Sequence, residues 1–314
     1  MTGASGEKDF GEGVSGPSPP TVEGVGPSRQ RLPAGRWETV LEFLTERFPG
    51  VGAETWLARM SEGRVTDEAG RRVGARTPYR AGACVFYYRE LEAEARVPFA
   101  ERVVYRDEHI LVADKPHFLP VVPAGRFLRE TLLVRLKQQG APASLVPVHR
   151  LDRETAGLVL FSLNPSTRGL YAALFRERKV AKFYEALAPA RADLRFPLTR
   201  RSRLAAGEPF FRMKEVEGEP NSETHVEVLG SRGALNLYGL RPATGRKHQL
   251  RLHLSALGMP IVNDRLYPEL RRADGDDFSR PLRLLARSLS FRDPLTGREH
   301  HFESDRELKG DDVD

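Results

Sequence analysis

The segment from His149 to Phe161 holds the residues best suited to chemistry. It places the carboxylate of Asp152 between Arg150 and Arg153, shortly before Gly157 and a run of apolar residues. A neighbouring arginine favours the ionised form of a carboxylate, and a loop at the edge of a strand fixes the carboxylate in space. Both properties suit a nucleophile. The same spacing also fits a surface cluster of charges that caps a turn, and the pattern alone leaves both interpretations open.

A second segment, Arg241 to Leu254, is rich in cations. Thr244-Gly245 indicates a turn into a helix, in which Leu250 faces the core while His248 and Arg251 project from another face. Cations and the free N–H groups of a helix N-terminus both suit a phosphate backbone. A solvated basic helix face is the alternative.

A third segment is predicted to be a strand. Lys182 and Tyr184 share one of its faces, because successive side chains of a strand point to opposite sides. A tyrosine beside a lysine can transfer protons or provide a platform on which a nucleobase stacks. Packing in the core is the alternative.

The composition excludes the membrane and disulfide-rich classes. The chain has 314 residues, 40% hydrophobic and 29% charged, and its longest apolar run is far shorter than the ~20 residues that span a bilayer. Its single cysteine, Cys84, cannot form an internal disulfide or a thiolate-only metal site. The spacing of His149, His248 and His253 matches no metal-binding pattern, so no metal is expected. No secretory signal is recognisable, and a cytoplasmic location is expected.

The net charge of +6 favours a polyanionic partner. Only eight of the 49 basic residues are lysines, and guanidinium groups match phosphate geometry better than ammonium groups do. The alternative is that a GC-rich genome inflates arginine and that most of these charges are solvated surface.

The predicted domain organisation is a small module followed by a larger domain. Residues 1–34 and 305–314 are expected to be disordered tails, because they have almost nothing to bury. Residues 35–90 are predicted to form a small α+β module, 91–98 are typical of a linker, and 99–304 form the larger domain.

Apolar periodicity predicts the elements of both domains. In the small module it predicts helices at 36–48 and 53–60 and strands near 65 and 84–88. In the larger domain it predicts helices at 131–139, 165–178 and 246–257, and strands at 103–105, 110–113, 157–163, 183–188, 224–229, 235–240 and 282–291. Several strands follow one another without a crossover helix. The sequence therefore predicts an α+β fold whose mixed or antiparallel sheet is flanked by helices.

Taken together and in chain order, these segments resemble the successive motifs of the RluA-type pseudouridine synthases. The matching residues are His149-Arg150-Leu151-Asp152 with Thr155 and Gly157, then Lys182-x-Tyr184, then Thr244-Gly245-Arg246-x-His248-Gln249-Leu250-Arg251-x-His253, and Gly258-x-Pro260-Ile261-x-x-Asp264-x-x-Tyr267. Asp114-Lys115-Pro116 is similar to the opening Lys-Pro motif of that family. The likeness covers residues 100–304. The module before it loosely resembles the RNA-binding domain named after small-subunit ribosomal protein four.

The resemblance implies isomerisation of uridine to pseudouridine in ribosomal or transfer RNA, by an enzyme that needs no cofactor. It implies that Asp152 is the nucleophile and that Arg251 is its ion-pair partner. It also implies that Tyr184 stacks on the target uracil and helps to remove the proton at carbon five, and that Arg150 fills the space left by the flipped base. The residues expected to bind RNA are Arg150, Thr155, Lys182, Arg246, His248, Gln249 and Lys115.

Three positions depart from the family pattern. Ala156 replaces the usual serine, Phe118 the usual glycine, and Leu285-Ala286 the usual His-Ala. These differences concern RNA contacts and subfamily, and none of them changes the three residues expected to be catalytic. They prevent any inference about which uridine is modified.

Two other hypotheses remain open at this point. One is an RNA-binding or ribosome-assembly factor without catalysis, against which the intact set of Asp152, Tyr184 and Arg251 argues. The other is a carboxylate-dependent glycosidase, which would release free uracil and would need a second acid. Glu154 has no evident partner for that role. A monomer is the default expectation.

Overall fold

The computed structural model describes residues 25–89, 94–271 and 275–308. The chain divides into two compact units, one up to Glu92 and one from Ala93 onward. Each unit has its own sheet.

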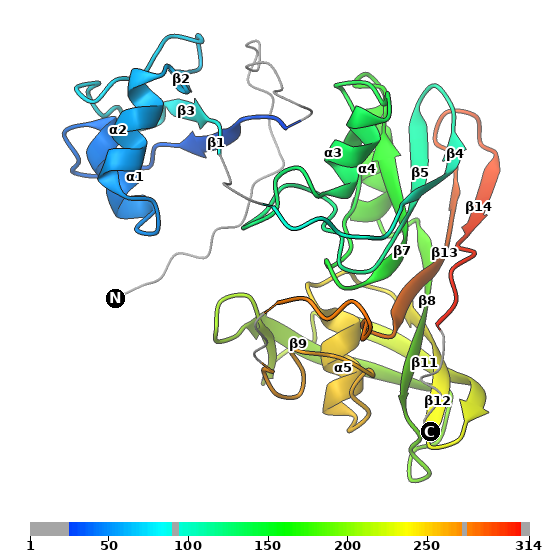
Figure 1. The fold of residues 1–314 in the computed structure, drawn as a ribbon. Coiled ribbons are helices and arrows are strands. Elements are labelled where there is room, and N and C mark those ends of the chain that lie inside the picture. Colours follow the sequence, from blue (N-terminus) through cyan, green and yellow to red (C-terminus); the bar gives the residue numbers. More distant parts are fainter. Residues whose placement is uncertain (1–24, 90–93, 272–274, 309–314) are drawn as a thin grey trace. The chain divides into compact units, whose positions relative to one another are not determined.

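The first unit combines two helices with a three-stranded antiparallel sheet (Figure 1). Its elements are β1 (Ser28–Arg31), α1 (Val40–Arg47), α2 (Ala53–Ser61), β2 (Val65–Asp67) and β3 (Cys84–Tyr87), with β3 in the centre of the sheet. The hydroxyl of Thr39 accepts a hydrogen bond from the N–H of Glu42, one of the donors that the start of α1 leaves free. Trp56, Phe43 and Leu44 lie in the core.

The N-terminal tail is shorter than predicted. Residues Ser28–Arg31 pair with β3, and Leu32 is buried, so the prediction of disorder up to residue 34 is wrong for these residues. The strand is not evident from the sequence, because Ser-Arg-Gln-Arg is entirely polar and pairs through its backbone at an edge of the sheet. The predicted tail of residues 1–24 lies outside the described part of the chain.

The second unit is built on an eleven-stranded sheet in the order β10-β9-β11-β12-β8-β13-β7-β5-β4, with β14 paired to β13 and β6 to β7. Its strands are β4 (Arg102–Arg106), β5 (Ile110–Lys115), β6 (Val146–Pro147), β7 (Ala156–Ser162), β8 (Ala181–Pro189), β9 (Leu198–Ala206), β10 (Met213–Val216), β11 (Ser222–Arg232), β12 (Leu235–Pro242), β13 (Leu284–Arg292) and β14 (Glu299–Glu303). Its helices are α3 (Leu132–Gln138), α4 (Arg168–Arg176) and α5 (Gln249–Ala256). Strands β7 and β13 are parallel, and the other pairs are antiparallel. The predicted α+β fold with a mixed sheet is confirmed.

Helices cover both faces of the sheet at β5 and β7, whose residues are buried throughout. Leu111 of β5 shares one core cluster with Leu132 of α3, and Leu160 of β7 shares another with Tyr171 of α4. Burial on both faces explains why these strands are continuous apolar runs in the sequence. None of the described helices is long and apolar enough to cross a membrane.

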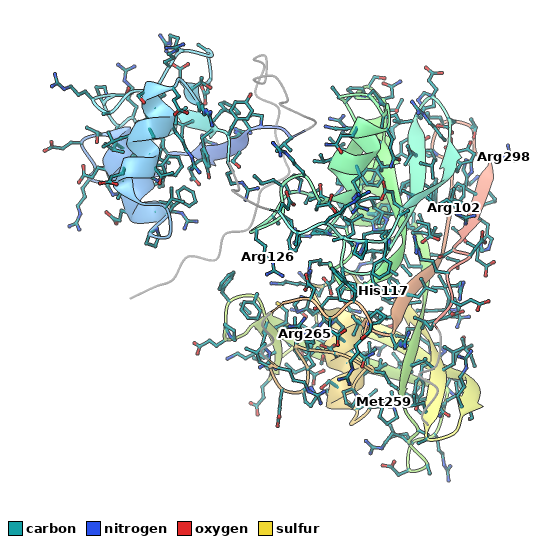
Figure 2. All side chains as sticks on the ribbon, in the orientation of Figure 1. Arg102, His117, Arg126, Met259, Arg265 and Arg298 are labelled. Atoms are coloured by element: carbon teal, nitrogen blue, oxygen red, sulfur yellow. The ribbon has the colours of Figure 1, made fainter. Side chains whose placement is uncertain are left out.

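Helix α5 covers the half of the sheet formed by β8 and β12. Its residues Leu250 and Leu254 pack there together with Met259, which is labelled in Figure 2. Arg251, on an adjacent side of α5, then faces the loop before β7, where it pairs with Asp152 and Glu154. The helix thereby brings its polar residues to the loop that carries Asp152.

The second unit also includes residues predicted to be linker and tail. The carboxylate of Glu94 accepts hydrogen bonds from the backbone N–H groups of residues 128–130, and Val97 is buried. At the other end, Arg306 binds the carboxylate of Asp114 on β5, and Leu308 is buried. The predictions of a linker up to residue 98 and of a disordered tail from residue 305 are therefore wrong for these residues. Residues 90–93 and 309–314 lie outside the described part.

Gly157 allows the parallel strands β7 and β13 to approach each other. Its φ is +112°, and a Cβ at this position would lie 2.3 Å from the carbonyl oxygen of Ala286. We expect Gly157→Ala to lower the free energy of unfolding by about 3 kcal/mol or more, because both the backbone conformation and the contact become unfavourable. Urea denaturation of the purified variant measures the loss.

Gly140→Ala is the matched control for this substitution. Gly140 has a φ of +93°, but a Cβ added to it would meet no atom within 4 Å, so this variant tests the backbone conformation without the contact. A loss of about 1 kcal/mol is expected. Equal losses in the two variants would show that the contact with Ala286 does not restrict residue 157.

Candidate active site

The candidate site is a cavity of about 790 Å³ where the loop before β7, the strand β8 and the start of α5 meet. It brings together nine of the ten residues predicted from the sequence. They are Arg150, Asp152, Thr155, Lys182, Tyr184, Arg246, His248, Gln249 and Arg251. Lys115 does not line the cavity.

The loop that carries Asp152 is fixed to β7 by its first residue. His149 Nε2 accepts a hydrogen bond from the N–H of Leu160 at 3.0 Å, and its ring stacks on Phe175 at 4.6 Å between centroids. Burial lowers the pKa of His149 to about 3, so the imidazole is neutral and can act as this acceptor. The histidine thus positions the loop by accepting a bond that a charged ring could not accept.

Lys115 supports the same loop through its backbone. The prediction that this lysine binds RNA is wrong. Its side chain is fully buried, and Nζ donates to the carbonyl oxygens of Pro116, Leu119 and Arg153 at 2.8–3.0 Å. Burial lowers its pKa well below the usual range. The lysine ties the end of β5 to the backbone next to Asp152 and has no path to a ligand.

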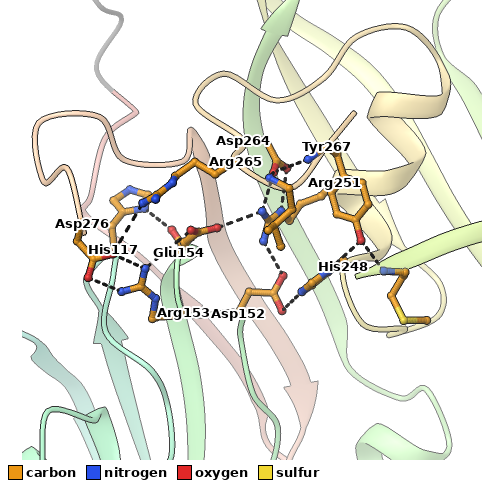
Figure 3. A network of polar contacts seen from close by, with 12 residues as sticks. His117, Asp152, Arg153, Glu154, His248, Arg251, Asp264, Arg265, Tyr267 and Asp276 are labelled. Atoms are coloured by element: carbon orange, nitrogen blue, oxygen red, sulfur yellow. Dashed lines mark hydrogen bonds and ion pairs between the residues drawn. The ribbon is translucent and has the colours of Figure 1, made fainter. Parts of the chain in front are cut away.

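Asp152 lies between two side chains of the α5 segment, as Figure 3 shows. Its Oδ2 is 3.6 Å from Nη1 of Arg251, and its Oδ1 is 3.8 Å from Nε2 of His248. The Asp152 side chain is 28% exposed, whereas that of Arg251 is 2% exposed. The carboxylate is therefore accessible from the cavity while its partner is enclosed. The predicted pairing of Asp152 with Arg251 is present in this arrangement.

Arg251 is held mainly by carboxylates other than Asp152. Its Nε and Nη2 donate to the two oxygens of Asp264 at 2.8 and 2.6 Å, and Nη2 also donates to Glu154 at 3.0 Å. Burial alone would lower the pKa of Arg251, but the hydrogen bonds and charge of Asp264, with Asp152 and Glu154, raise it above its ordinary value. The guanidinium stays charged, and Nη1 is left to face Asp152.

Two carboxylates of the site, Asp264 and Glu154, have roles that were not expected from the sequence. A signal for Asp264 is present in the Asp264-x-x-Tyr267 motif, because its Oδ1 also accepts hydrogen bonds from the N–H groups of Leu266 and Tyr267. Glu154 has no local signal, since its partner Arg251 is 97 residues away in the chain.

A second arginine pair fixes the other side of the Asp152 loop. Arg153 donates to both oxygens of Asp276 at 2.8 and 2.7 Å, and its guanidinium lies 5.1 Å from the ring centroid of Phe127. Bidentate arginine–carboxylate pairs hold geometry well. The residues on both sides of Asp152 are thus anchored, which limits the positions that the catalytic candidate can take.

Tyr184 is half-buried on β8 and lines the cavity. Burial, with a smaller contribution from the charge of Asp152, raises its pKa above the ordinary value, so the phenol is protonated at neutral pH. Lys182, two residues earlier on the same face, has its pKa lowered by burial, and its Nζ is 3.5 Å from the carbonyl oxygen of Thr244. The structure presents a neutral aromatic ring beside a carboxylate.

Gln249 lines the cavity but has no free polar atom to offer, so the prediction that it binds RNA is wrong. Its Oε1 accepts from the hydroxyl of Thr244 and the N–H of Arg246, and its Nε2 donates to the carbonyl oxygen of Glu223 and the hydroxyl of Thr224. Gln249 closes the turn that begins α5.

The rim of the cavity is cationic. Exposed arginines and a lysine lie on it, while Asp152 is the sole carboxylate among the lining residues in the described part of the chain. The exposed cations are Arg150, Arg176, Arg178, Arg246 and Lys247. Such a rim suits a phosphodiester backbone. In residues 25–89, 94–271 and 275–308, no cluster of three or more His, Cys, Asp or Glu side chains could hold a metal ion.

Comparisons with known proteins show similarity to RNA pseudouridine synthases. A family model described as RNA pseudouridylate synthase matches residues 109–256. An uncharacterised RNA pseudouridine synthase of Synechocystis sp. is 31% identical over 73% of this chain and 79% of its own length. The dual-specificity RNA pseudouridine synthase RluA of Pasteurella multocida is 34% identical over 62% of this chain and 88% of its own length.

A solved structure has the same fold. Human RNA pseudouridylate synthase domain containing 1 superposes with a TM-score of 0.55 at 26% identity, over 68% of this chain and 86% of that one. The relatives and the fold define an RNA pseudouridine synthase, an isomerase. Within that class the chain belongs to the RluA-type family, as its motifs predict.

Histidines enclosed by the second unit predict that the fold weakens in mild acid. Burial lowers the pKa of His117, His248 and His253 to about 4 and that of His149 to about 3. In the unfolded chain these groups titrate near 6.5. The unfolded state therefore binds more protons below pH ~6.5, so stability is complete above that pH and is lost as the pH falls toward ~4. We expect Tm to drop by roughly 5 °C or more between about pH 7.5 and about pH 5.

His253→Gln tests this explanation with one of the four groups. The imidazole bonds to the hydroxyls of Thr224 and Ser222, both at 2.9 Å, and an amide can bond to hydroxyls without titrating. The fall of Tm with pH should become shallower in this variant. His301→Gln, on the exposed side of β14, is the matched control. An unchanged slope in His253→Gln would contradict the explanation.

Proposed function

We propose that this enzyme converts specific uridines of ribosomal or transfer RNA to pseudouridine, with Asp152 as the nucleophile and the target base flipped into the cavity. The placement of Asp152 carries the proposal. Its carboxylate lines the cavity and lies 3.6 Å from the buried guanidinium of Arg251. A charged arginine keeps the carboxylate ionised when a base enters the pocket and displaces water.

The proposed reaction balances within the substrate. The Asp152 carboxylate attacks C1′ of the ribose, and the bond between N1 of uracil and C1′ breaks with its electron pair on N1. The uracil turns, C5 bonds to C1′, and the ester bond between Asp152 and C1′ breaks, which restores the carboxylate. C5 loses a proton and N1 gains one, so the product is an isomer of the substrate and no redox partner is consumed.

Tyr184 is proposed to hold the uracil by stacking. Its pKa is raised by burial and by Asp152, so its hydroxyl carries a proton at neutral pH and the neutral ring suits a base. This favours stacking over the second role expected from the sequence, acceptance of the C5 proton.

Arg150 and the other rim cations are proposed to hold the RNA around the flipped nucleotide. Arg150 is exposed at the mouth of the cavity, two residues before Asp152. Flipping a base out of a helix costs a few kcal/mol, and an inserted side chain can offset part of that cost. Arg246, Arg176 and Arg178 lie on the same rim and suit the phosphates of neighbouring nucleotides.

The N-terminal unit is proposed to add affinity for RNA. It loosely resembles an RNA-binding domain, and it exposes arginines at positions 72, 76 and 80. A monomeric state and a cytoplasmic location stay predictions from the sequence.

Asp152→Ala should abolish pseudouridine formation, with a loss of at least about 10³-fold, because no other residue supplies the nucleophile. RNA affinity should stay within about threefold, since the cationic rim is intact. Pseudouridine mapping in cells that carry only the variant, together with gel-shift titration, measures both quantities.

Asp193→Ala is the control for that substitution. Asp193 pairs with Arg191 at 2.6 Å and does not line the cavity, so activity should be retained. Unchanged pseudouridine content in Asp152→Ala would favour an RNA-binding factor on the same scaffold. Release of free uracil by the unaltered enzyme would favour a glycosidase.

Deletion of residues 1–92 should separate affinity from chemistry. The second unit contains every cavity residue named above, so turnover of a small stem–loop should be unchanged. Affinity for a long RNA should fall by about tenfold, through loss of phosphate contacts, and the dependence on salt should weaken. Equal affinity with and without the first unit would show that it does not contact RNA.

A further inference from the structure

His248 occupies a strained backbone position next to Asp152, the candidate nucleophile. It is the N-cap residue of α5, with φ 54° and ψ 18°, in the left-handed region that residues other than glycine rarely adopt. Its side chain is 8% exposed. Such strain persists only where the surrounding structure fixes it, and it concentrates at functional sites. A histidine that only bound RNA would require neither the strained backbone nor the burial.

The hydrogen bonds around His248 fix which ring nitrogen carries the proton. The hydroxyl of Tyr267 accepts from the N–H of Met213 at 2.8 Å, and it lies 3.0 Å from His248 Nδ1. Among the described residues Nδ1 is the one acceptor within hydrogen-bond distance of this hydroxyl, so its proton is satisfied only when the hydroxyl donates to Nδ1. Burial lowers the pKa of His248 to about 4 despite the nearby charge of Asp152, so the ring is neutral. A neutral ring that accepts at Nδ1 carries its proton on Nε2.

The protonated Nε2 faces the oxygen of Asp152 that Arg251 does not face. Nε2 lies 3.8 Å from Oδ1, and Nη1 of Arg251 lies 3.6 Å from Oδ2. A cation therefore lies near one oxygen, and a neutral N–H group lies near the other. This arrangement orients the carboxylate without placing a second positive charge on it, which would make it a weaker nucleophile.

The short segment 264–267 positions both Arg251 and His248. Asp264 fixes the guanidinium of Arg251 through two hydrogen bonds, and Tyr267 fixes the tautomer of His248. Asp264 also accepts the N–H of Tyr267 itself, which ties the two residues to each other. Figure 3 shows this connected set from Tyr267 through His248 to Asp152.

We propose that His248 is a positioning residue for Asp152, held as the Nε2–H tautomer by Tyr267, rather than a ligand of the RNA. The proposal rests on the proposed function for its kinetic consequence. The tautomer of His248 is a property of the folded enzyme and does not depend on the reaction.

The first experiment measures the tautomer in the full-length enzyme labelled with ¹⁵N-histidine. The His248 ring should show a protonated Nε2 and an unprotonated Nδ1 at neutral pH, assigned by comparison with His248→Gln. In Tyr267→Phe this preference should be lost. A protonated Nδ1 in the unaltered enzyme would overturn the proposal, whether or not Asp152 is the nucleophile.

The second experiment measures kcat and KM on an RNA stem–loop. His248→Leu removes the donor and should lower kcat by about 10- to 100-fold with KM within about threefold, because the lost interaction orients the nucleophile and does not bind substrate. His248→Gln keeps an N–H donor at a comparable reach and should recover most of kcat. His301→Gln is the control and should match the unaltered enzyme.

Tyr267→Phe keeps the packing of the segment and should lower kcat by about 3- to 10-fold, also without a change in KM. It serves as the second variant if His248→Leu does not fold. A rise in KM with unchanged kcat in the His248 variants would show that His248 binds RNA and would overturn the proposal. Activity that survives Asp152→Ala would instead refute the proposed function and leave the measured tautomer unaffected.

Discussion

The buried charge of Arg251 is the constraint on which the rest of the site depends. A guanidinium that is 2% exposed is stable only when carboxylates surround it, and its partners come from separate parts of the chain. Glu154 and Asp152 lie before β7, and Asp264 follows α5. Folding must bring these segments together for the charge to be compensated. The position of Asp152, the proposed nucleophile, is therefore a consequence of the way one buried cation is paired.

Strand pairing in the sheet brings these segments together. Parallel pairing of β7 with β13 places the loop before β7 beside β8, and Gly157 permits the close approach. Strand β8 then presents Tyr184 to the loop, and α5 packs on β8 and β12 with Arg251 toward the cavity. Lys115 hydrogen-bonds to the backbone of this loop, and His149 hydrogen-bonds to the backbone of β7, so both residues hold the loop in position. The residues that support the site are buried and neutral or fully paired, and the cations on the rim of the cavity, which are proposed to hold RNA, are exposed.

Much of this organisation is predictable from sequence, and the failures have physical reasons. The buried strands β5 and β7 are strong apolar runs, whereas β9, β10 and β14 lie toward edges and carry polar residues, so periodicity does not indicate them. Asp152, Tyr184 and Arg251 follow from motifs. The roles of Lys115 and Gln249 do not, because residue type cannot show that every donor of a lysine or an amide is used internally. The role of Glu154 is visible only in the folded structure, where it pairs with Arg251.

Two departures from the family pattern become explicable when they are considered as a pair. Ala156, in place of serine, and Leu285, in place of histidine, are direct partners in the parallel register of β7 and β13. Both are fully buried, in a cluster with Leu187 and Leu308. A buried polar group requires a partner, so removing both polar members of a contact is far less costly than removing one. In this chain the two positions form an apolar pair in the core, so neither leaves a buried polar group without a partner.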